Sequence, residues 1–147
     1  MGVRIVMAAL AVSLSAGYLH ADLQRALAEQ DLGKRSKLAL ENAAAAMDTA
    51  RKAYQEGNLD VVASAAKEIE DSVNLAYISL QQTGKDPRKS PKWFKAAELA
   101  TRDLTRRLQN FQEDMSYDDR PLLDKVIARV QQVHDNLLMG LMEGKRR

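Results

Sequence analysis

The 147-residue chain contains no cysteine. This absence excludes disulfide bonds, thiolate metal sites, covalently attached haem and a lipid-modified N-terminal cysteine. It does not fix the compartment, because an exported protein can fold without disulfides. Any metal or cofactor site must therefore be built from other side chains.

Aromatic side chains are also scarce, at 5% of the residues, and alanine and leucine dominate the apolar set instead. Alanine and leucine favour helices, whereas strands are rich in aromatic and β-branched residues. No segment alternates apolar and polar residues with the period of two that is typical of a half-buried strand. The composition therefore predicts an all-α protein.

The chain carries little excess charge, with a formal net charge of +2. Such a protein has no global positive field that would attract nucleic acid, so we do not expect a nucleic-acid partner. Electrostatic recognition must instead come from a local cluster of charges.

The sequence also lacks the motifs of common catalytic sites. It has no Gly-x-Ser-x-Gly elbow, no Gly-rich phosphate loop and no cysteine–histidine pair. Acidic residues stand beside basic ones, as in Glu98 with Arg102 and Asp103 with Arg107, whose i,i+4 spacing is typical of exposed helix faces. The segment KEIEDS at residues 67–72 is interpreted as a solvated face too. We therefore expect no enzyme activity, no catalytic residue, and no metal or cofactor.

The first residues have the layout of a secretory signal peptide. Arg4 precedes an apolar run from Ile5 to about Ala16, and small residues follow. The run is shorter than the roughly 20 residues of a membrane-spanning helix. We expect residues 1–21 to be a signal peptide cleaved after Ala21, and the protein to be periplasmic or secreted. Cleavage after Ala16, retention as an uncleaved anchor, and a cytosolic protein with an apolar N-terminal helix are the alternatives.

Beyond residue 34, apolar residues recur at alternating steps of three and four, which keeps them on one face of a helix in the manner of a coiled coil. Four stripes have this spacing: Leu40, Ala43, Met47, Ala50, Tyr54; Leu59, Val62, Ala66, Ile69, Val73, Ala76, Leu80; Phe94, Ala97, Thr101, Leu104, Leu108, Phe111, Met115; and Leu123, Val126, Val130, Val133, Leu137, Leu141. The stripes predict helices over residues 34–56, 58–83, 91–116 and 119–142.

Turn-forming residues separate the stripes. Gly57–Asn58 suits the end of one helix and the start of the next, so the first two helices should form a tight hairpin. Ser90–Pro91 is typical of an N-cap followed by proline in the first turn. Before the last helix, Asp118 or Asp119 is the expected cap and Pro121 fits the first turn.

Four helices of similar length with short connections favour antiparallel neighbours. We therefore predict that residues 34–144 form an antiparallel up-down-up-down four-helix bundle. Residues 22–33 should form a short N-terminal helix or extension that Gly33 interrupts or bends. Residues 145–147 form a basic tail.

The segment AYQEGNLD at residues 53–60 resembles the turn between the two helices of a tetratricopeptide repeat. In such a repeat an aromatic residue, here Tyr54, ends the first helix, and Ala50 matches the small residue near its middle. The resemblance covers about residues 41–74, and no second copy follows at a period of about 34 residues. Membership of that family would imply a scaffold that binds peptides or proteins.

A cofactor-binding bundle is the main alternative from a different class of protein. Once the signal peptide is removed, His134 is the only histidine, and Met47 and Met115 are the candidates to face it across a haem. Both methionines also fit the core stripes, where a flexible side chain fills gaps. We interpret His134 as a boundary residue whose polar edge lies in water, with a haem- or metal-binding bundle as the alternative.

The segment KDPRKSPKWFK at residues 85–95 has five cationic residues and one carboxylate, so most of the chain's positive excess lies there, and it holds the only tryptophan of the chain. Lysines in the first turn of a helix oppose its dipole, and an anionic partner would relieve that cost. The candidate binding residues are Lys85, Arg88, Lys89, Lys92, Trp93 and Lys95. The competing interpretation is a solvated loop in which Trp93 and Phe94 cover the end of the bundle.

Taken with the apolar stripes, this segment favours an exported, noncatalytic bundle that binds a protein or an anionic component of the cell envelope, including peripheral contact with a membrane. A haem- or metal-binding bundle and a self-assembling structural protein are the two alternatives.

Overall fold

The computed structural model describes residues 23–144, and every regular element within this range is a helix. The four long helices are α2 (Leu32–Gln55), α3 (Leu59–Gln82), α4 (Pro91–Asp114) and α5 (Pro121–Glu143). A short helix occupies residues 23–28, and the 3-10 turn η1 (Tyr117–Asp119) precedes α5. The predicted all-helical fold with four packed long helices is confirmed. The signal peptide expected at residues 1–21 and the basic tail at 145–147 lie outside the described residues.

The predicted stripes form the core of this bundle. Only three of their residues are not buried: Tyr54 and Leu141 are half-buried, and Leu59 is 40% exposed in the first turn of α3. Alanine keeps α2 narrow, since Ala39, Ala43, Ala46 and Ala50 are all fully buried. Small side chains let a neighbouring backbone approach closely, and α2 makes its most extensive packing with α3.

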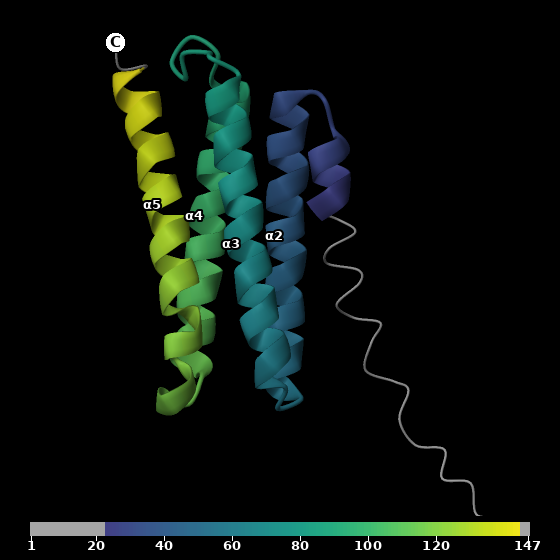
Figure 1. The fold of residues 1–147 in the computed structure, drawn as a ribbon. Helices are drawn as coiled ribbons and strands as arrows, with labels where there is room; N and C mark the ends of the chain where they lie inside the picture. Colours follow the sequence, from purple (N-terminus) through teal and green to yellow (C-terminus); the bar gives the residue numbers. More distant parts are fainter. Residues whose placement is uncertain (1–22, 145–147) are drawn as a thin grey trace, which may run out of the picture.

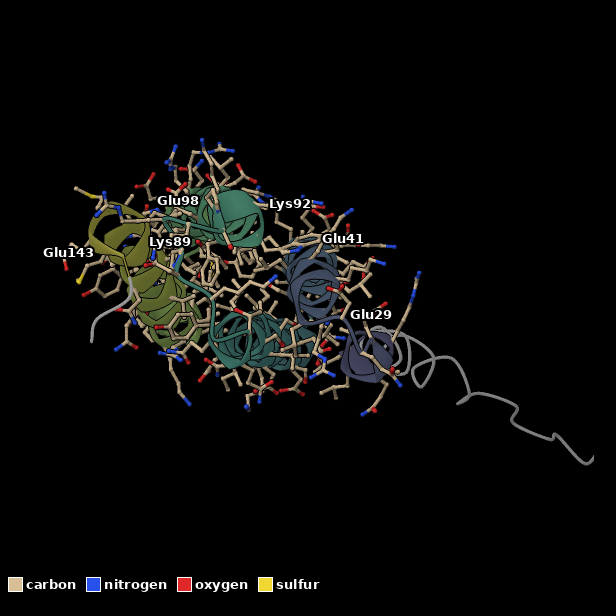
Figure 2. The ribbon with its side chains drawn as sticks, turned by 90° about the horizontal axis from the view of Figure 1, so that it is seen from above. Glu29, Glu41, Lys89, Lys92, Glu98 and Glu143 are labelled. Atoms are coloured by element: carbon tan, nitrogen blue, oxygen red, sulfur yellow. The ribbon has the colours of Figure 1, made fainter. Side chains whose placement is uncertain are left out.

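Two hairpins, α2–α3 and α4–α5, pack against each other. Contacts between the hairpins join α3 to α5 and α2 to α4. Viewed from one end, the order around the bundle is α2, α3, α5, α4 (Figure 2). The helices α3 and α4 are consecutive in sequence but lie on a diagonal, which differs from the expectation that short connections join neighbours. The connector at residues 83–90 permits this, because an extended chain covers up to about 3.3–3.6 Å per residue.

The helices α3 and α5 run side by side in the same direction. The Nζ atom of Lys125 lies 3.6 Å from Oε1 of Glu70, and Arg129 Nε donates to Asn74 Oδ1 at 2.6 Å. A step of four residues along α3, from Glu70 to Asn74, thus corresponds to a step of four residues in the same direction along α5, from Lys125 to Arg129. In Figure 1 the α2–α3 turn and η1 lie at the lower end, and the connector lies at the upper end.

The turns between the helices follow the sequence closely, with one difference. Gly57 has a φ of 74°, and the side chain of Asn58 caps α3 by accepting from the backbone N–H of Val61 at 3.2 Å. Neither aspartate of η1 caps α5, whose N-cap is Arg120. Asp119 is drawn away because its Oδ2 accepts from the hydroxyl of Tyr54 at 3.0 Å.

The break before α2 occurs earlier than expected. Residues 29–31 separate the short helix from α2, and Asp31 caps α2 by accepting from the backbone N–H of Lys34 at 2.9 Å. Gly33 therefore lies inside the first turn of α2 and does not interrupt a helix. Among residues 23–144, no helix combines the length and the apolar composition needed to cross a bilayer.

Candidate binding end of the bundle

The basic segment at residues 85–95, called the basic end below, closes the upper end of the bundle. Asp86 organises its turn: the backbone carbonyl accepts from the N–H groups of Lys89 at 3.1 Å and Ser90 at 2.9 Å, and Oδ1 accepts from the N–H of Arg88 at 2.9 Å. The only carboxylate of the segment is thus used within the turn. Pro91 starts α4 as predicted, although the side chain of Ser90 makes no capping hydrogen bond.

The cations of the basic end are solvent-exposed and lack carboxylate partners. None of them forms an ion pair with a carboxylate in the described part of the chain. The five residues are Lys85, Arg88, Lys89, Lys92 and Lys95. Elsewhere, cations bridge neighbouring helices, as Arg107 does to Asp48 at 2.6 Å. Figure 2 shows Lys89 and Lys92 on the end of the bundle that faces the viewer.

The two aromatic residues at the start of α4 have different environments. Phe94 belongs to the core and is 8% exposed, whereas Trp93 is half-buried. The indole lies directly over Gly33, where any larger residue would collide with its Nε1, and the Nζ atom of Lys92 lies 4.7 Å from the indole centroid. Of the two aromatics expected to cover the end of the bundle, Phe94 is buried in the core and Trp93 is only half-buried.

Two hollows lie beside the buried side chains of Leu80 and Phe94, which line both of them. The larger, called the end hollow below, has a volume of about 440 Å³. It is lined by Asp31, Leu32, Gly33, Leu80, Thr83, Lys85, Ser90, Pro91, Lys92, Trp93 and Phe94. The second has about 400 Å³ and lies toward α5, and it shares Leu80, Lys85 and Phe94 with the first. The structure therefore places Lys85, Lys92 and Trp93 around one hollow, while Arg88, Lys89 and Lys95 lie outside it.

Asp31 is the one carboxylate that lines the end hollow. The hydrogen bond from the backbone N–H of Lys34 lowers the pKa of Asp31, and the positive charges of Lys34 and Lys85 act in the same direction. The carboxylate is therefore ionised at neutral pH and offsets part of the lysine charge around the hollow.

A second polar cluster, between α4 and α5, was misjudged from the sequence. Glu98 does not lie on an exposed face: it is 4% exposed, and its Oε1 accepts from Arg102 Nη2 at 2.5 Å and from His134 Nε2 at 3.0 Å. His134 is only 18% exposed, and its Nδ1 lies 3.3 Å from Oδ1 of Asp135. The i,i+4 pair of Glu98 and Arg102 thus belongs to an interhelical cluster in which the carboxylate is buried and the guanidinium is exposed.

Burial raises the pKa of Glu98, but the hydrogen bonds from Arg102 and His134 outweigh it, so the pKa lies below its ordinary value. The second predicted pair is also different, because Asp103 bonds to Arg106 rather than to Arg107. Arg107 reaches across to α2 instead.

The segment 67–72 is likewise not a fully solvated face. Glu68 and Ser72 are buried, and both accept from Nδ2 of Asn42 on α2, at 2.9 and 2.8 Å. Oδ1 of Asn42 is buried without a hydrogen-bond partner. No feature of spacing distinguishes these polar residues from exposed ones; an asparagine within an alanine-rich stripe is the only available hint.

The three residues considered as haem ligands, Met47, Met115 and His134, have different surroundings. Met47 and Met115 are buried core residues, and both ring nitrogens of His134 face carboxylate oxygens. Residues 23–144 contain no cluster of three or more histidine, aspartate or glutamate side chains arranged to hold a metal ion.

Comparison of the chain with models of known protein families gives no match, and comparison with curated proteins finds none with significant similarity.

Proposed function

We propose that the protein is an exported, noncatalytic binding protein whose basic end contacts an anionic component of the cell envelope. The observation that supports this most directly is the set of five cations at one end of the bundle that form no ion pair with a carboxylate of residues 23–144. Elsewhere, carboxylates of neighbouring helices neutralise several of the cations. Unpaired positive charge, concentrated in one place, attracts an anionic surface and loses that attraction as salt screens it.

Export and topology belong to the same proposal. The layout of residues 1–21 supports export to the periplasm or the exterior. The alternation of long helices with turns at opposite ends supports an up-down-up-down order (Figure 1). Fractionation of cells that express the full chain, compared with a chain starting at Asp22, tests export: loss of the exported form is expected without residues 1–21.

Charge reversal tests the binding role. A variant with Lys89→Glu, Lys92→Glu and Lys95→Glu should lose retention on heparin and on vesicles that contain anionic lipid. Neutral vesicles should bind neither this variant nor the natural chain. The loss should be largest at low salt, where the Debye length is longest.

A matched control separates a local site from total charge. Lys52→Glu, Arg106→Glu and Lys125→Glu change the net charge equally. All three residues are exposed, and they lie near the end of α2, in the second half of α4 and near the start of α5, away from the basic end. The control should retain most of the binding. Equal losses in both variants, or retention in both, would refute a binding role for the basic end.

A further inference from the structure

The end hollow combines an apolar interior with a charged rim. Its interior consists of side chains from α3 and α4, chiefly Leu80, Trp93 and Phe94, of which Leu80 is 1% exposed. Lys85 and Lys92 also line it, and both are solvent-exposed, so we take them as its rim. Ligand sites are typically concave and mostly apolar, with a few convergent polar groups that fix orientation.

The charge balance of the hollow favours a ligand with a single negative charge. Two lysines and one aspartate line it, so one positive charge is in excess. Asp31 is held by the first turn of α2, where it accepts from the backbone N–H of Lys34. Neither lysine forms an ion pair with a carboxylate within residues 23–144, although the charge of Lys85 acts on Asp31, and the Nζ atom of Lys92 rests over the indole of Trp93.

The volume of the end hollow limits the size of the apolar part of a ligand. The volume of about 440 Å³ lies toward the lower end of the roughly 300–1,000 Å³ that is typical of small-molecule sites. A chain of about ten carbons with one carboxylate fits this limit, whereas a polymer or a folded partner would contact only the mouth.

We propose that the end hollow binds a single-chain anionic amphiphile, an alkyl carboxylate, with its chain against Leu80, Trp93 and Phe94 and its carboxylate between Lys85 and Lys92. This inference deepens the proposed function, because it assigns a small ligand to the same end of the bundle. It differs in the residues that carry it, since Lys89 and Lys95 do not line the hollow.

The test uses the chain's own tryptophan as the reporter. Trp93 is the only tryptophan and forms a wall of the hollow. Titration with decanoate, below the concentration at which it forms micelles, should shift the Trp93 emission to shorter wavelength in a saturable manner. Decyltrimethylammonium should give no saturable shift, and decanol should bind more weakly than decanoate.

Two variants test the two halves of the site. Lys85→Gln with Lys92→Gln should raise the Kd for decanoate by about fivefold, as expected for contacts on a partly exposed rim. Ser90→Phe should abolish binding by filling the mouth, and it removes no capping bond because the Ser90 side chain makes none. Circular dichroism and urea unfolding establish that each variant is folded before titration.

The results separate this inference from the proposed function. No saturable shift with decanoate, an equal response to the cationic amphiphile, or unchanged affinity in both variants overturns the ligand site. If decanoate fails while anionic vesicles still depend on Lys89, Lys92 and Lys95, the basic end remains a surface contact and the hollow is not a ligand site. If decanoate binds but neither vesicles nor heparin retain the protein, the hollow is a ligand site and the basic end has no role as a surface contact.

Discussion

His134 Nε2 on α5 lies 3.0 Å from Glu98 Oε1 on α4, and the same oxygen accepts from Arg102. A carboxylate that is 4% exposed is thus satisfied by one donor from its own helix and one from the neighbouring helix. The cluster lies at the contact between the two helices of the second hairpin (Figure 2). A buried carboxylate in this position stabilises the fold only while it is charged and its donors are in place.

The variant Glu98→Gln should therefore be less stable at pH 7, by about 1–3 kcal/mol, because hydrogen bonds to a charged group are lost in a buried site. The effect depends on pH. Glu98 has a folded pKa below its ordinary value of 4.5, so its contribution is present above pH 4.5 and is lost as the pH falls through the folded pKa. Urea unfolding of both proteins should show a difference that shrinks toward pH 2.

Glu41→Gln provides the matched control. Glu41 pairs with Lys37 at 3.8 Å on an exposed face, where such pairs contribute about 0–1 kcal/mol. A stability loss as large as that of Glu98→Gln would show that charge removal in general, and not the buried cluster, is responsible.

The apolar periodicity predicted the helices to within a few residues, because core burial requires one face of each helix to be apolar. Val130 and Leu108 are buried for this reason alone. The burial of Glu98 has no such signature, since its partner His134 is 36 residues away and belongs to another helix. The diagonal placement of α3 and α4 is also not encoded in any stripe: it depends on which faces complement each other between hairpins. The sequence identified the basic residues of the segment 85–95. It did not show which of them surround a hollow, because that also depends on how the two hairpins pack.

The interhelical bonds of Asn42 should be coupled to Glu68. Asn42→Ala removes a donor from a buried carboxylate and should destabilise the protein by about 1–3 kcal/mol. The double variant Asn42→Ala with Glu68→Ala should lose less than the sum of the two single variants, because the carboxylate that needs the donor is then gone. Thermal or urea unfolding of the four proteins measures the coupling; strict additivity would contradict it.

Tyr54 ties the end of α2 to η1. Its hydroxyl accepts from the backbone N–H of Ser116 at 2.9 Å and donates to Asp119, and its ring packs edge-on against Phe111 at a centroid distance of 5.7 Å. Tyr54→Phe keeps the ring contact and should cost about 0.5–1.5 kcal/mol. Tyr54→Ala removes both and should cost more, about 3–5 kcal/mol. Equal losses in urea unfolding would assign the whole effect to the hydroxyl.

Gly33 allows the indole of Trp93 to lie directly against α2. A Cβ at this position would collide with the indole nitrogen, so Gly33→Ala should displace the ring and destabilise the protein by about 1–3 kcal/mol. The emission of Trp93 should move to longer wavelength as the indole becomes more exposed. In a Trp93→Leu background the collision is absent, and Gly33→Ala should be neutral or stabilising by up to about 1 kcal/mol, since alanine is the better helix former. Unfolding measurements on the four proteins decide the matter: a Gly33→Ala effect of the same size in both backgrounds would mean that contact with the indole is not what requires glycine.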